Sequence, residues 1–476
     1  MSKNHSGLKP GIVEALSEVL DAEQILDDLE SCKTYGSDWT IHGQAGIVVR
    51  PRSTEDVSNI MKVCHKLGQA VVPSAGRTGL AGGAVSQVGE VAISCELMTS
   101  LEPVDAVART IVVQPGVITS DLQLVAEEAG LYFAIDLGAK ESSRIGGNIA
   151  TNVGGLKLVR YGGMREQILG LEVVLPDGEV LDLNRELYKD NTGYKLQQLF
   201  IGSEGTLGFI TKACIRLWSP PPPLRLACLR LSDLSAAGKV IKRLNQSNLE
   251  VYAVEYFDSQ CLKLVKKVTP EVRVPGEDYY SCGQHYLLIE VDDQCHQFEP
   301  LLMTAYDEDL VKDIVIGDSP ADQRDLWQLR ELISESISVE RQVYKNDISI
   351  PIGSIIPFLE RIESTVDSEK PYLQKTNIEI LCFGHLGDGN LHLNYTCPKN
   401  FDAKDFKDAV EDLESTILSL VRDFRGSISA EHGIGILKKN HLAMTCSGEE
   451  IKWMKRVKKL FDPNNIMNPG KIFEIG

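Results

Sequence analysis

The chain contains 476 residues, of which 43% are hydrophobic and 24% are charged, and it carries a formal net charge of −18 at pH 7. Because a single hydrophobic core stops growing at about 250–300 residues, this length predicts two or three domains. The acidic balance argues against nucleic acid, whose binders need a basic surface, and against docking on anionic lipid, although a local Arg/Lys pocket can still hold an anionic substrate.

The N-terminal segment, MSKNHSGLKPG, has neither the apolar core of a signal peptide nor the character of a transit peptide, which is typical of a cytoplasmic protein. Eleven scattered cysteines without a C-x-x-C pair fit reduced thiols in the same compartment. No run approaches about 20 uninterrupted apolar residues, so no membrane span is expected.

The first regular elements form a β-α-β unit that leads into a glycine loop. Residues 12–31 show helical spacing and predict one or two leading helices. A strand is expected at 46–50, followed by a helix that begins at the capping box Ser53-Thr54-Glu55-Asp56 and ends at Gly68. A second strand at 70–73 completes the unit.

Short strands continue up to a run of prolines. They are expected at 92–95, 110–113, 170–175, 180–183 and 206–217, with a hairpin turn between the third and the fourth. The run Pro220-Pro221-Pro222-Pro223 interrupts any regular structure and is the clearest domain boundary.

Strand and helix patterns alternate after the prolines, which is typical of an open antiparallel α+β sheet. The chain then ends at 461–471 in a short helix end and a tail. Strands are expected at 226–231, 249–257 and 286–291, and helices at 236–244 and 404–425.

Three glycine-rich segments stand out before the prolines. The segment 73–83 follows a strand but is not the G-x-G-x-x-G of a dinucleotide-binding fold. Its backbone N–H groups could bind a pyrophosphate, and an ordinary glycine-rich turn is the alternative. Two similar segments, 144–155 and 200–208, indicate one long ligand held along its length.

Two histidines flank the sequence Asp388-Gly389, the strongest short hairpin signal. A two-residue loop there would place His385 directly opposite His392 on one sheet face, with Cβ atoms roughly 5 Å apart. That spacing suits two imidazoles on one Zn²⁺, and Glu431 would complete a His₂Glu set with one open position. Asn394 would face the same side. An ordinary turn with two polar histidines is the alternative.

Seven segments, spread over nearly the whole chain, together resemble the vanillyl-alcohol-oxidase type of FAD-dependent dehydrogenases. Within that type, the resemblance is strongest to the group that acts on D-2-hydroxy acids. The segments are PSAGRTGLAGG (73–83), DLGAKESSRIGGNIATNVGG (136–155), DNTGYKLQQLFIGSEGTLG (190–208), LWQLRE (326–331), GHLGDGNLHLN (384–394), SAEHGIG (429–435) and DPNNIMNPGK (462–471).

The resemblance implies an α+β fold with three parts. A PCMH-type FAD-binding domain of two α/β subdomains would span 1–220, an antiparallel-sheet cap for substrate and metal would span 221–425, and 426–476 would return to the FAD domain. FAD would be non-covalent because the loop carries Arg77-Thr78 rather than a His or Cys link. The implied FAD-binding residues are Ala75, Gly76, Arg77, Thr78, Gly79, Ser143, Gly146, Gly147, Asn148, Thr151, Asn152, Gly154, Gly155, Glu204, Gly208, Ile210 and Asn468.

The resemblance also implies a zinc site and a catalytic base. His385, His392 and Glu431 would hold Zn²⁺, His432 would take the hydroxyl proton, and Asn394 would contact the substrate. Neighbours on a strand point to opposite faces, so Glu431 and His432 can serve one centre only if the backbone turns between them.

Arg330 and Ser334 lie one turn apart in the helix expected at 326–337, and Lys345 lies in an extended polar stretch. From the residues alone, these would be ordinary solvated side chains. The resemblance places all three on the substrate, where Arg330 would clamp a carboxylate. Two cations beyond the metal favour a small anionic dicarboxylate, D-2-hydroxyglutarate or D-malate, oxidised to the 2-oxo acid.

Other functions stay open at this point. A D-lactate or glycolate dehydrogenase or oxidase of the same fold is one, and a flavin-dependent transferase or a non-catalytic FAD-binding subunit are others. An electron-transfer flavoprotein or quinone would accept the electrons, and the resemblance suggests a homodimer.

Overall fold

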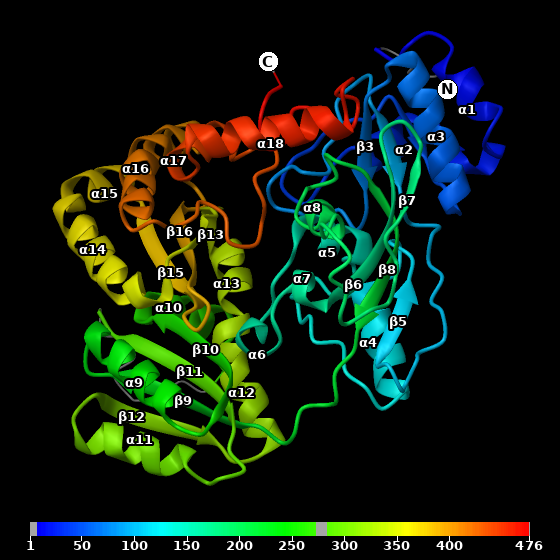
Figure 1. Ribbon diagram of the computed structural model, residues 1–476. Helices are drawn as coiled ribbons and strands as arrows, with labels where there is room; N and C mark the ends of the chain where they lie inside the picture. Colours follow the sequence, from blue (N-terminus) through cyan, green and yellow to red (C-terminus); the bar gives the residue numbers. More distant parts are fainter. Residues whose placement is uncertain (1–6, 273–282, 476) are drawn as a thin grey trace. The chain divides into compact units, whose positions relative to one another are not determined.

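The computed structural model describes residues 7–272 and 283–475, and within them the chain forms two compact units (Figure 1). Unit 1 contains the chain up to Gly155, Tyr161–Pro220 and everything from Glu431 onward. Unit 2 contains Leu156–Arg160 and Pro221–Ala430. Both units combine helices with sheets rich in antiparallel pairs, so the predicted α+β class is confirmed.

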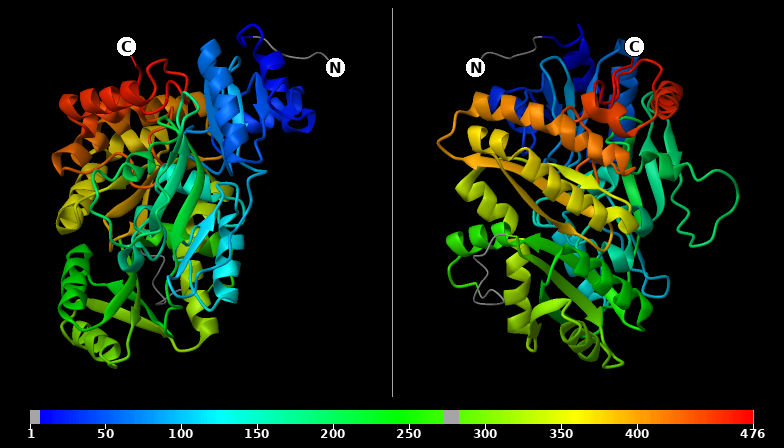
Figure 2. Two further views of the ribbon diagram at one scale, coloured as in Figure 1. Left: turned by 45° about the vertical axis from the view of Figure 1, so that its right-hand side comes forward. Right: turned by 90° about the vertical axis from the view of Figure 1, so that its left-hand side faces the viewer.

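The first sheet of unit 1 has the strand order β1-β2-β4-β3, drawn in blue in Figure 2. β2 and β3 each pair with β4 in parallel, and a helix joins β2 to β3, as expected for strands that run in the same direction. That helix, α3 (Thr54–Leu67), starts where the Ser53 side chain accepts from the N–H of Asp56, and it ends at Gly68, where φ is 63°. The predicted β-α-β unit is therefore confirmed. The strands are β1 (Ile25–Leu26), β2 (Ile47–Val49), β3 (Val71–Ser74) and β4 (Val91–Ser94).

The second sheet of unit 1 is antiparallel, with the order β5-β8-β6-β7. β6 and β7 form the predicted hairpin. β8 starts at Phe209, later than predicted, because Glu204 and Gly205 take positive φ values of 51° and 67° in a turn. The strands are β5 (Thr110–Val113), β6 (Ile168–Val174), β7 (Val180–Asp182) and β8 (Phe209–Arg216).

Each sheet of unit 1 has its own hydrophobic core, and Val174 and Phe209 of the second sheet also pack into the core of the first. The helices are α1 (Ile12–Ser17), η1 (Ala22–Gln24), α2 (Leu29–Tyr35), α3, α4 (Thr119–Glu128), α5 (Ile145–Thr151), α7 (Met164–Gln167), α8 (Gln197–Phe200), η3 (Lys439–His441), α17 (Leu442–Thr445) and α18 (Gly448–Phe461).

The C-terminal part of unit 1 is fixed by one buried lysine. Lys458 of α18 donates to the carbonyls of Thr206 at 2.8 Å and Met467 at 2.6 Å, and pairs with Asp462 at 2.5 Å. Met467 in turn bridges Val71 of β3. A buried ammonium is stable only with such partners, so these contacts tie the end of the chain to the first sheet.

Unit 2 is built on one eight-stranded sheet with the order β12-β9-β11-β10-β15-β16-β13, and β14 also pairs with β16. All of its pairs are antiparallel, and the strands predicted at 226–231, 249–257 and 286–291 are confirmed. The strands are β9 (Arg225–Leu231), β10 (Glu250–Asp258), β11 (His285–Asp292), β12 (Val311–Gly317), β13 (Arg341–Tyr344), β14 (Asp347–Ser349), β15 (Glu379–His385) and β16 (Asn390–Pro398).

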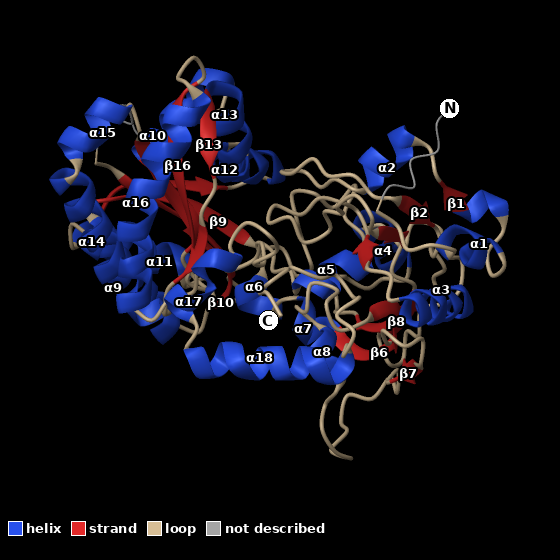
Figure 3. Cartoon of the chain, turned by 90° about the horizontal axis from the view of Figure 1, so that it is seen from above, coloured by secondary structure: helices blue, strands red, loops and turns tan. Residues whose placement is uncertain are grey.

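Helices cover both faces of this sheet (Figure 3). One face packs against α9 (Leu234–Gln246), α11 (Phe298–Asp307), α14 (Ile355–Ser368), α15 (Lys370–Thr376) and α16 (Ala403–Asp423). The other packs against α10 (Ser259–Val268), α12 (Pro320–Glu331) and α13 (Ile333–Glu340). The single helix predicted at 326–337 is therefore wrong, because the chain breaks into α12 and α13 at Leu332. The helices predicted at 236–244 and 404–425 are confirmed.

A short excursion from the first part of the chain completes unit 2. Lys157 pairs with Glu290 of β11 at 3.0 Å, and Arg160 pairs with Glu250 of β10 at 2.7 Å. The helix α6 (Leu158–Tyr161) begins in this segment, and η2 (Ile352–Ser354) precedes α14. None of the helices in the described part of the chain is both long and apolar enough to cross a bilayer.

Candidate active site

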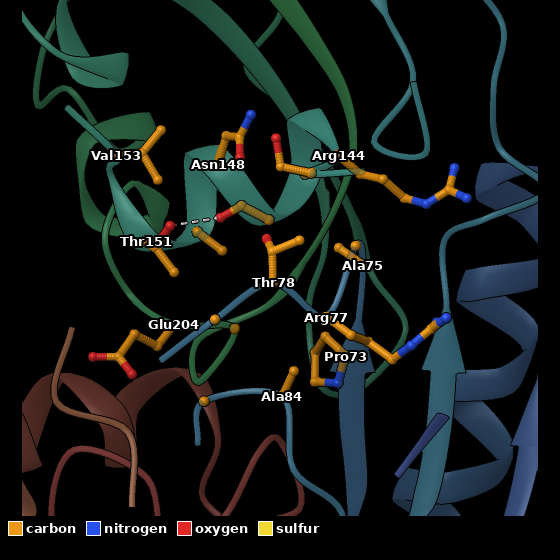
Figure 4. A pocket seen from close by; sticks show the side chains of 18 of the residues that line it. Pro73, Ala75, Arg77, Thr78, Ala84, Arg144, Asn148, Thr151, Val153 and Glu204 are labelled. Atoms are coloured by element: carbon orange, nitrogen blue, oxygen red, sulfur yellow. Dashed lines mark hydrogen bonds between the residues drawn. The ribbon is translucent and has the colours of Figure 1, made fainter. Parts of the chain in front are cut away.

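A cavity of about 310 Å³ lies within unit 1 and is walled by the three glycine-rich segments (Figure 4). Its volume is within the range of about 300–1,000 Å³ typical of small-molecule and cofactor sites. Fourteen of the predicted FAD-binding residues line it. They are Ala75, Gly76, Arg77, Thr78, Gly79, Ser143, Gly146, Gly147, Asn148, Thr151, Gly154, Glu204, Gly208 and Ile210.

The loop after β3 approaches its neighbours closely because it lacks side chains. A Cβ on Gly76 would lie 2.4 Å from the carbonyl oxygen of Ser142, and one on Gly146 would lie 2.5 Å from Cβ of Pro115. Only glycine fits at such distances. A Cβ on Gly147 would lie 3.1 Å from Cβ of Ala75, so the missing side chain sets the spacing between the loop and α5, whose helical form the sequence did not predict.

Arg77 has a structural role that the sequence did not indicate. It adopts a φ of 57°, and its guanidinium lies 4.5 Å from the centroid of the Tyr35 ring. The Tyr35 hydroxyl donates to Glu96, which also pairs with Arg50. In Figure 4 the guanidinium groups of Arg77 and Arg144 lie on the opposite side of the pocket from Glu204. Arg77 thus helps to hold the loop in its strained form.

Glu204 organises the other side of the cavity. This residue is 9% exposed, and its carboxylate accepts from the N–H groups of Ile434 and Gly435 at 2.8 Å each. A Cβ on Gly433 would lie 2.9 Å from the carboxyl carbon. Burial raises the pKa of Glu204, although the two N–H donors act in the opposite direction. Its side chain therefore fixes the segment that directly follows Glu431 and His432, which also line the cavity.

The donor set suits a long, polar cofactor. Ser74, 2% exposed, lines the cavity, and its hydroxyl has no hydrogen-bond partner among the described residues. A Cβ on Gly138 would meet nothing within 4 Å, so the cavity has room there for a ligand. A buried hydroxyl normally finds a partner, and a bound nucleotide would supply one. FAD therefore fits the residues that line the cavity.

Three predicted FAD-binding residues lie outside the cavity wall. Asn152 caps α5 with a φ of 51°, and its side chain accepts from the N–H of Arg165. Gly155 packs against the backbone of Asp136. Asn468 donates to the carbonyl of Glu204 at 2.7 Å. All three adjoin residues that line the cavity, either along the chain or through a hydrogen bond.

The predicted hairpin register in unit 2 is wrong by two residues. His392 was predicted opposite His385 but lies opposite Phe383. Asn394 was predicted opposite Phe383 but lies opposite Leu381. The loop contains four residues, 386–389, because Leu386 is fully buried in the core and the N–H of Gly387 donates to Val254. A shift of two preserves the sheet face, so the two histidines still share one.

His385 and His392 form a close pair, with ring centroids 5.5 Å apart. His385 lies directly opposite Glu255 of β10, and its Nδ1 is 2.8 Å from the Glu255 carboxylate. Arg330 of α12 donates its Nε to the same carboxylate at 2.7 Å, and its Nη2 is 3.4 Å from His385 Nε2. Burial opposes ionisation of Glu255, but His385 and Arg330 outweigh it and lower its pKa.

A second buried acid, Asp347 of β14, lies behind His392. Its Oδ1 is 3.9 Å from His392 Nδ1 and accepts from Asn390, while its Oδ2 accepts from the N–H of Ala430 at 3.1 Å. No local sequence pattern indicates Glu255 or Asp347, because strand pairing brings them to the histidines. Carboxylates behind metal-binding histidines are typical of metal sites, so the histidine pair fits a cation such as Zn²⁺.

The backbone after Ala430 is irregular, as required if Glu431 and His432 are to serve one centre. Residues 431 and 432 belong to neither a helix nor a strand, and Gly433 and Gly435 take positive φ values of 78° and 49°. The chain therefore bends where Glu431 and His432 must turn to serve one centre.

The remaining predicted substrate residues differ in exposure. Asn394 is 3% exposed, and its Oδ1 has no hydrogen-bond partner among the described residues. Lys345, between β13 and β14, is half-buried, and burial lowers its pKa. Ser334 is exposed on α13, so it and Arg330 are on different helices. Of these three residues, Asn394 is the one with a buried polar atom that a ligand could satisfy.

Two family models match the chain. They are the FAD binding domain, over residues 45–184, and the C-terminal domain of FAD linked oxidases, over residues 221–472. The D-2-hydroxyglutarate dehydrogenase of Stutzerimonas stutzeri (strain A1501) is 39% identical over 470 residues, which are 98% of this chain and 99% of that protein. The mitochondrial D-2-hydroxyglutarate dehydrogenase of Danio rerio is 36% identical, covering 94% of this chain and 82% of that protein.

Among solved structures, the 4-ethylphenol oxidase from Gulosibacter chungangensis in complex with isoeugenol has a TM-score of 0.77 and 18% identity, over 98% of this chain and 99% of that one. That likeness shows the shared fold. The chain belongs to the FAD-linked oxidase family, with its PCMH-type FAD-binding domain and its C-terminal domain. It is an FAD-linked oxidoreductase, as the resemblance implied.

Proposed function

We propose that this oxidoreductase converts D-2-hydroxyglutarate to 2-oxoglutarate with the help of Zn²⁺, and that it also accepts D-malate. The observation that carries the proposal is the adjacency of His385, His392 and Arg330. The two imidazole rings are 5.5 Å apart, and a guanidinium nitrogen lies 3.4 Å from one of them. A cation site beside a carboxylate-binding fork suits a 2-hydroxy acid, whose hydroxyl and carboxylate share one carbon.

His385, His392 and Glu431 would hold the zinc. The backbone N–H of Ala430 is anchored on Asp347, beside His392, and Glu431 is the next residue. Consecutive Cα atoms are about 3.8 Å apart, so Glu431 leaves this anchor within reach of the histidine pair. Two imidazoles and one carboxylate leave an open position, as in catalytic zinc sites, and bound Zn²⁺ would lower the pKa of the substrate hydroxyl.

His432 would take the hydroxyl proton. A histidine can do so near neutral pH, and His432 lines the same cavity wall as the predicted FAD-binding residues. Bound FAD would accept the hydride from the substrate carbon. Arg330 would hold the neighbouring carboxylate through its Nη atoms, since its Nε is already bonded to Glu255. Asn394, whose amide oxygen has no partner within residues 7–272 and 283–475, would orient the substrate.

The preference for a dicarboxylate would depend on Lys345. Burial lowers its pKa, so its ammonium gains more from an anionic partner than an exposed lysine does. Two relatives of 36% and 39% identity are D-2-hydroxyglutarate dehydrogenases, which supports the same substrate here. An electron-transfer flavoprotein or quinone would then re-oxidise the flavin.

The test is a panel of D- and L-2-hydroxy acids with a dye acceptor, with and without a chelator. We expect turnover of D-2-hydroxyglutarate and D-malate above D-lactate, loss of activity on chelation, and recovery with Zn²⁺. Lys345→Ala should lower kcat/KM for D-2-hydroxyglutarate about tenfold or more while sparing D-lactate. Lys407→Ala, on the exposed face of α16, is the control. An unchanged substrate ratio in Lys345→Ala, or full activity without metal, would contradict the proposal.

A further inference from the structure

Glu255 occupies the centre of unit 2. It lies on β10, between β11 and β15, and is paired in register with His385 of β15. Its side chain is only 1% exposed. Residues directly opposite each other on antiparallel strands project from the same face, so Glu255 and His385 must share one environment. Neither the sequence motifs nor the comparisons point to this acid.

The two oxygens of Glu255 serve two different partners. Oε1 is 2.8 Å from His385 Nδ1, and Oε2 accepts from Arg330 Nε at 2.7 Å. The Arg330 guanidinium is further held over the Phe383 ring, 4.8 Å from its centroid. A buried arginine and a buried acid are stable only when paired in this way, so the three side chains form one fixed unit.

Each of these bonds prepares its partner for a ligand. A carboxylate at Nδ1 keeps the proton of His385 on that nitrogen, so Nε2 carries the lone pair that a metal would bind. A bond at Nε fixes the plane of the Arg330 guanidinium and leaves its Nη atoms for a substrate carboxylate. Arg330 Nη2 donates to His385 Nε2 at 3.4 Å, so the guanidinium borders the metal-binding nitrogen, and a bound cation would take over the lone pair that now accepts this bond.

We propose that Glu255 is a positioning residue shared by the metal site and the substrate site, so that zinc affinity and substrate affinity depend on one carboxylate. This inference rests on the proposed function. On the other side of the pair, Asp347 lies 3.9 Å from His392 Nδ1 and also accepts from Asn390 and from the backbone of Ala430.

The decisive variant is Glu255→Gln. An amide of the same shape has one acceptor oxygen, so it can accept from Arg330 or from His385 but not from both, and its NH₂ group faces the partner that is left. Glu290→Gln is the matched control. Glu290 is a buried acid on the next strand that also contacts α12, but it accepts from Trp327 and pairs with Lys157.

Two measurements are made on the FAD-loaded full-length protein. Zinc affinity is measured by competition with a metal indicator, and kcat and KM for D-2-hydroxyglutarate are measured at zinc concentrations that saturate each variant. We expect Glu255→Gln to weaken zinc binding about 10–100-fold. With zinc restored, we expect KM to stay raised about tenfold while kcat changes less. Glu290→Gln should stay within about twofold of wild type in both.

A purely structural role for Glu255 would lower the melting temperature and the active fraction without this split between KM and kcat. Wild-type zinc affinity, or a wild-type KM in zinc-saturated Glu255→Gln, overturns the inference. If Glu255→Gln does not fold, Glu255→Asp replaces it, because the shorter acid keeps the charge but cannot reach both partners. A wild-type enzyme without zinc dependence would instead contradict the proposed function, whereas the indicator titration still reports on Glu255.

Discussion

The cavity of unit 1 and the histidine cluster of unit 2 are built from different kinds of chemical group. The cavity is walled largely by glycine, alanine and backbone from three separate segments. The cluster consists of charged and imidazole side chains, His385, Glu255 and Arg330, held between a sheet and a helix. One site therefore presents backbone groups at a fixed spacing, and the other presents ionisable groups with fixed partners.

This difference predicts how each site fails. A backbone-built cavity is damaged by an added atom, since its walls already touch where the glycines lie. A side-chain cluster is damaged by a removed group, since each buried charge depends on the next. Variants that add a methyl group in unit 1 or remove a ligand in unit 2 separate the two kinds of site.

Removing a histidine of the pair should have the largest effect. We expect His392→Ala to lower kcat by about 10³-fold, because metal catalysis contributes several kcal/mol of transition-state stabilisation. The FAD content should stay at the wild-type level, since His392 belongs to unit 2. Steady-state kinetics with a dye acceptor and the flavin absorbance of the purified protein check both parts.

The control for this variant is His296→Ala, which changes an exposed histidine of the same unit and should retain full activity. If His392→Ala kept more than about a tenth of the wild-type rate with no metal in the protein, the pair would have no catalytic role.

Adding one methyl group to the cavity wall should have the next largest effect, this time on FAD. The Cβ of Gly76→Ala would lie 2.4 Å from the carbonyl oxygen of Ser142, and overpacking of this kind costs about 1–3 kcal/mol. We expect FAD affinity to fall about tenfold or more. Gly448→Ala is the matched control, because the Cβ at this exposed position of unit 1 meets nothing within 4 Å and lies outside the cavity wall. The fraction of flavin retained on gel filtration is compared between the two variants. Equal retention would show that close contact at Gly76 does not control FAD binding.

The sequence predicted the cavity better than the cluster, for a physical reason. Glycine spacing in 73–83 and 144–155 is a local signal, and those residues form the wall. The register of the 385–392 hairpin depends on distant contacts, such as the burial of Leu386, and was predicted two residues away. Glu255 was missed because only the pairing of β10 with β15 brings it to His385.

A smaller effect is expected from the buried acid of unit 1. Burial raises the pKa of Glu204 above its ordinary value of 4.5. The folded protein therefore keeps a proton on this carboxyl at pH values where the unfolded chain has lost it, and the resulting stability is lost as pH rises through the folded pKa. Glu204→Gln lacks this titration. The melting temperature of Glu204→Gln minus that of wild type should therefore increase by about 2 °C as pH rises from 4.5 toward neutral.

Differential scanning calorimetry of Glu204→Gln and wild type across that pH range measures this difference in melting temperature. The missing acceptor for Ile434 or Gly435 lowers the stability of Glu204→Gln by an amount that does not depend on pH, so only the slope is compared. Glu127→Gln, an exposed acid on α4, should give a flat difference. A slope of the opposite sign would mean that the two N–H donors outweigh burial and hold the carboxylate ionised.

The smallest effect is expected at Ser334. Its substitution tests whether the substrate site extends beyond the cluster of His385, Glu255 and Arg330. Ser334 is exposed on α13, whereas Arg330 is buried on α12 and bonded to Glu255. Substitution of an exposed side chain usually changes a free energy by no more than about 0.5 kcal/mol, so Ser334→Ala should alter kcat/KM for D-2-hydroxyglutarate about twofold or less. Arg330→Lys, which loses the fork, should raise KM far more. A tenfold loss in Ser334→Ala would show that the substrate site extends beyond the buried cluster onto the exposed surface of α13.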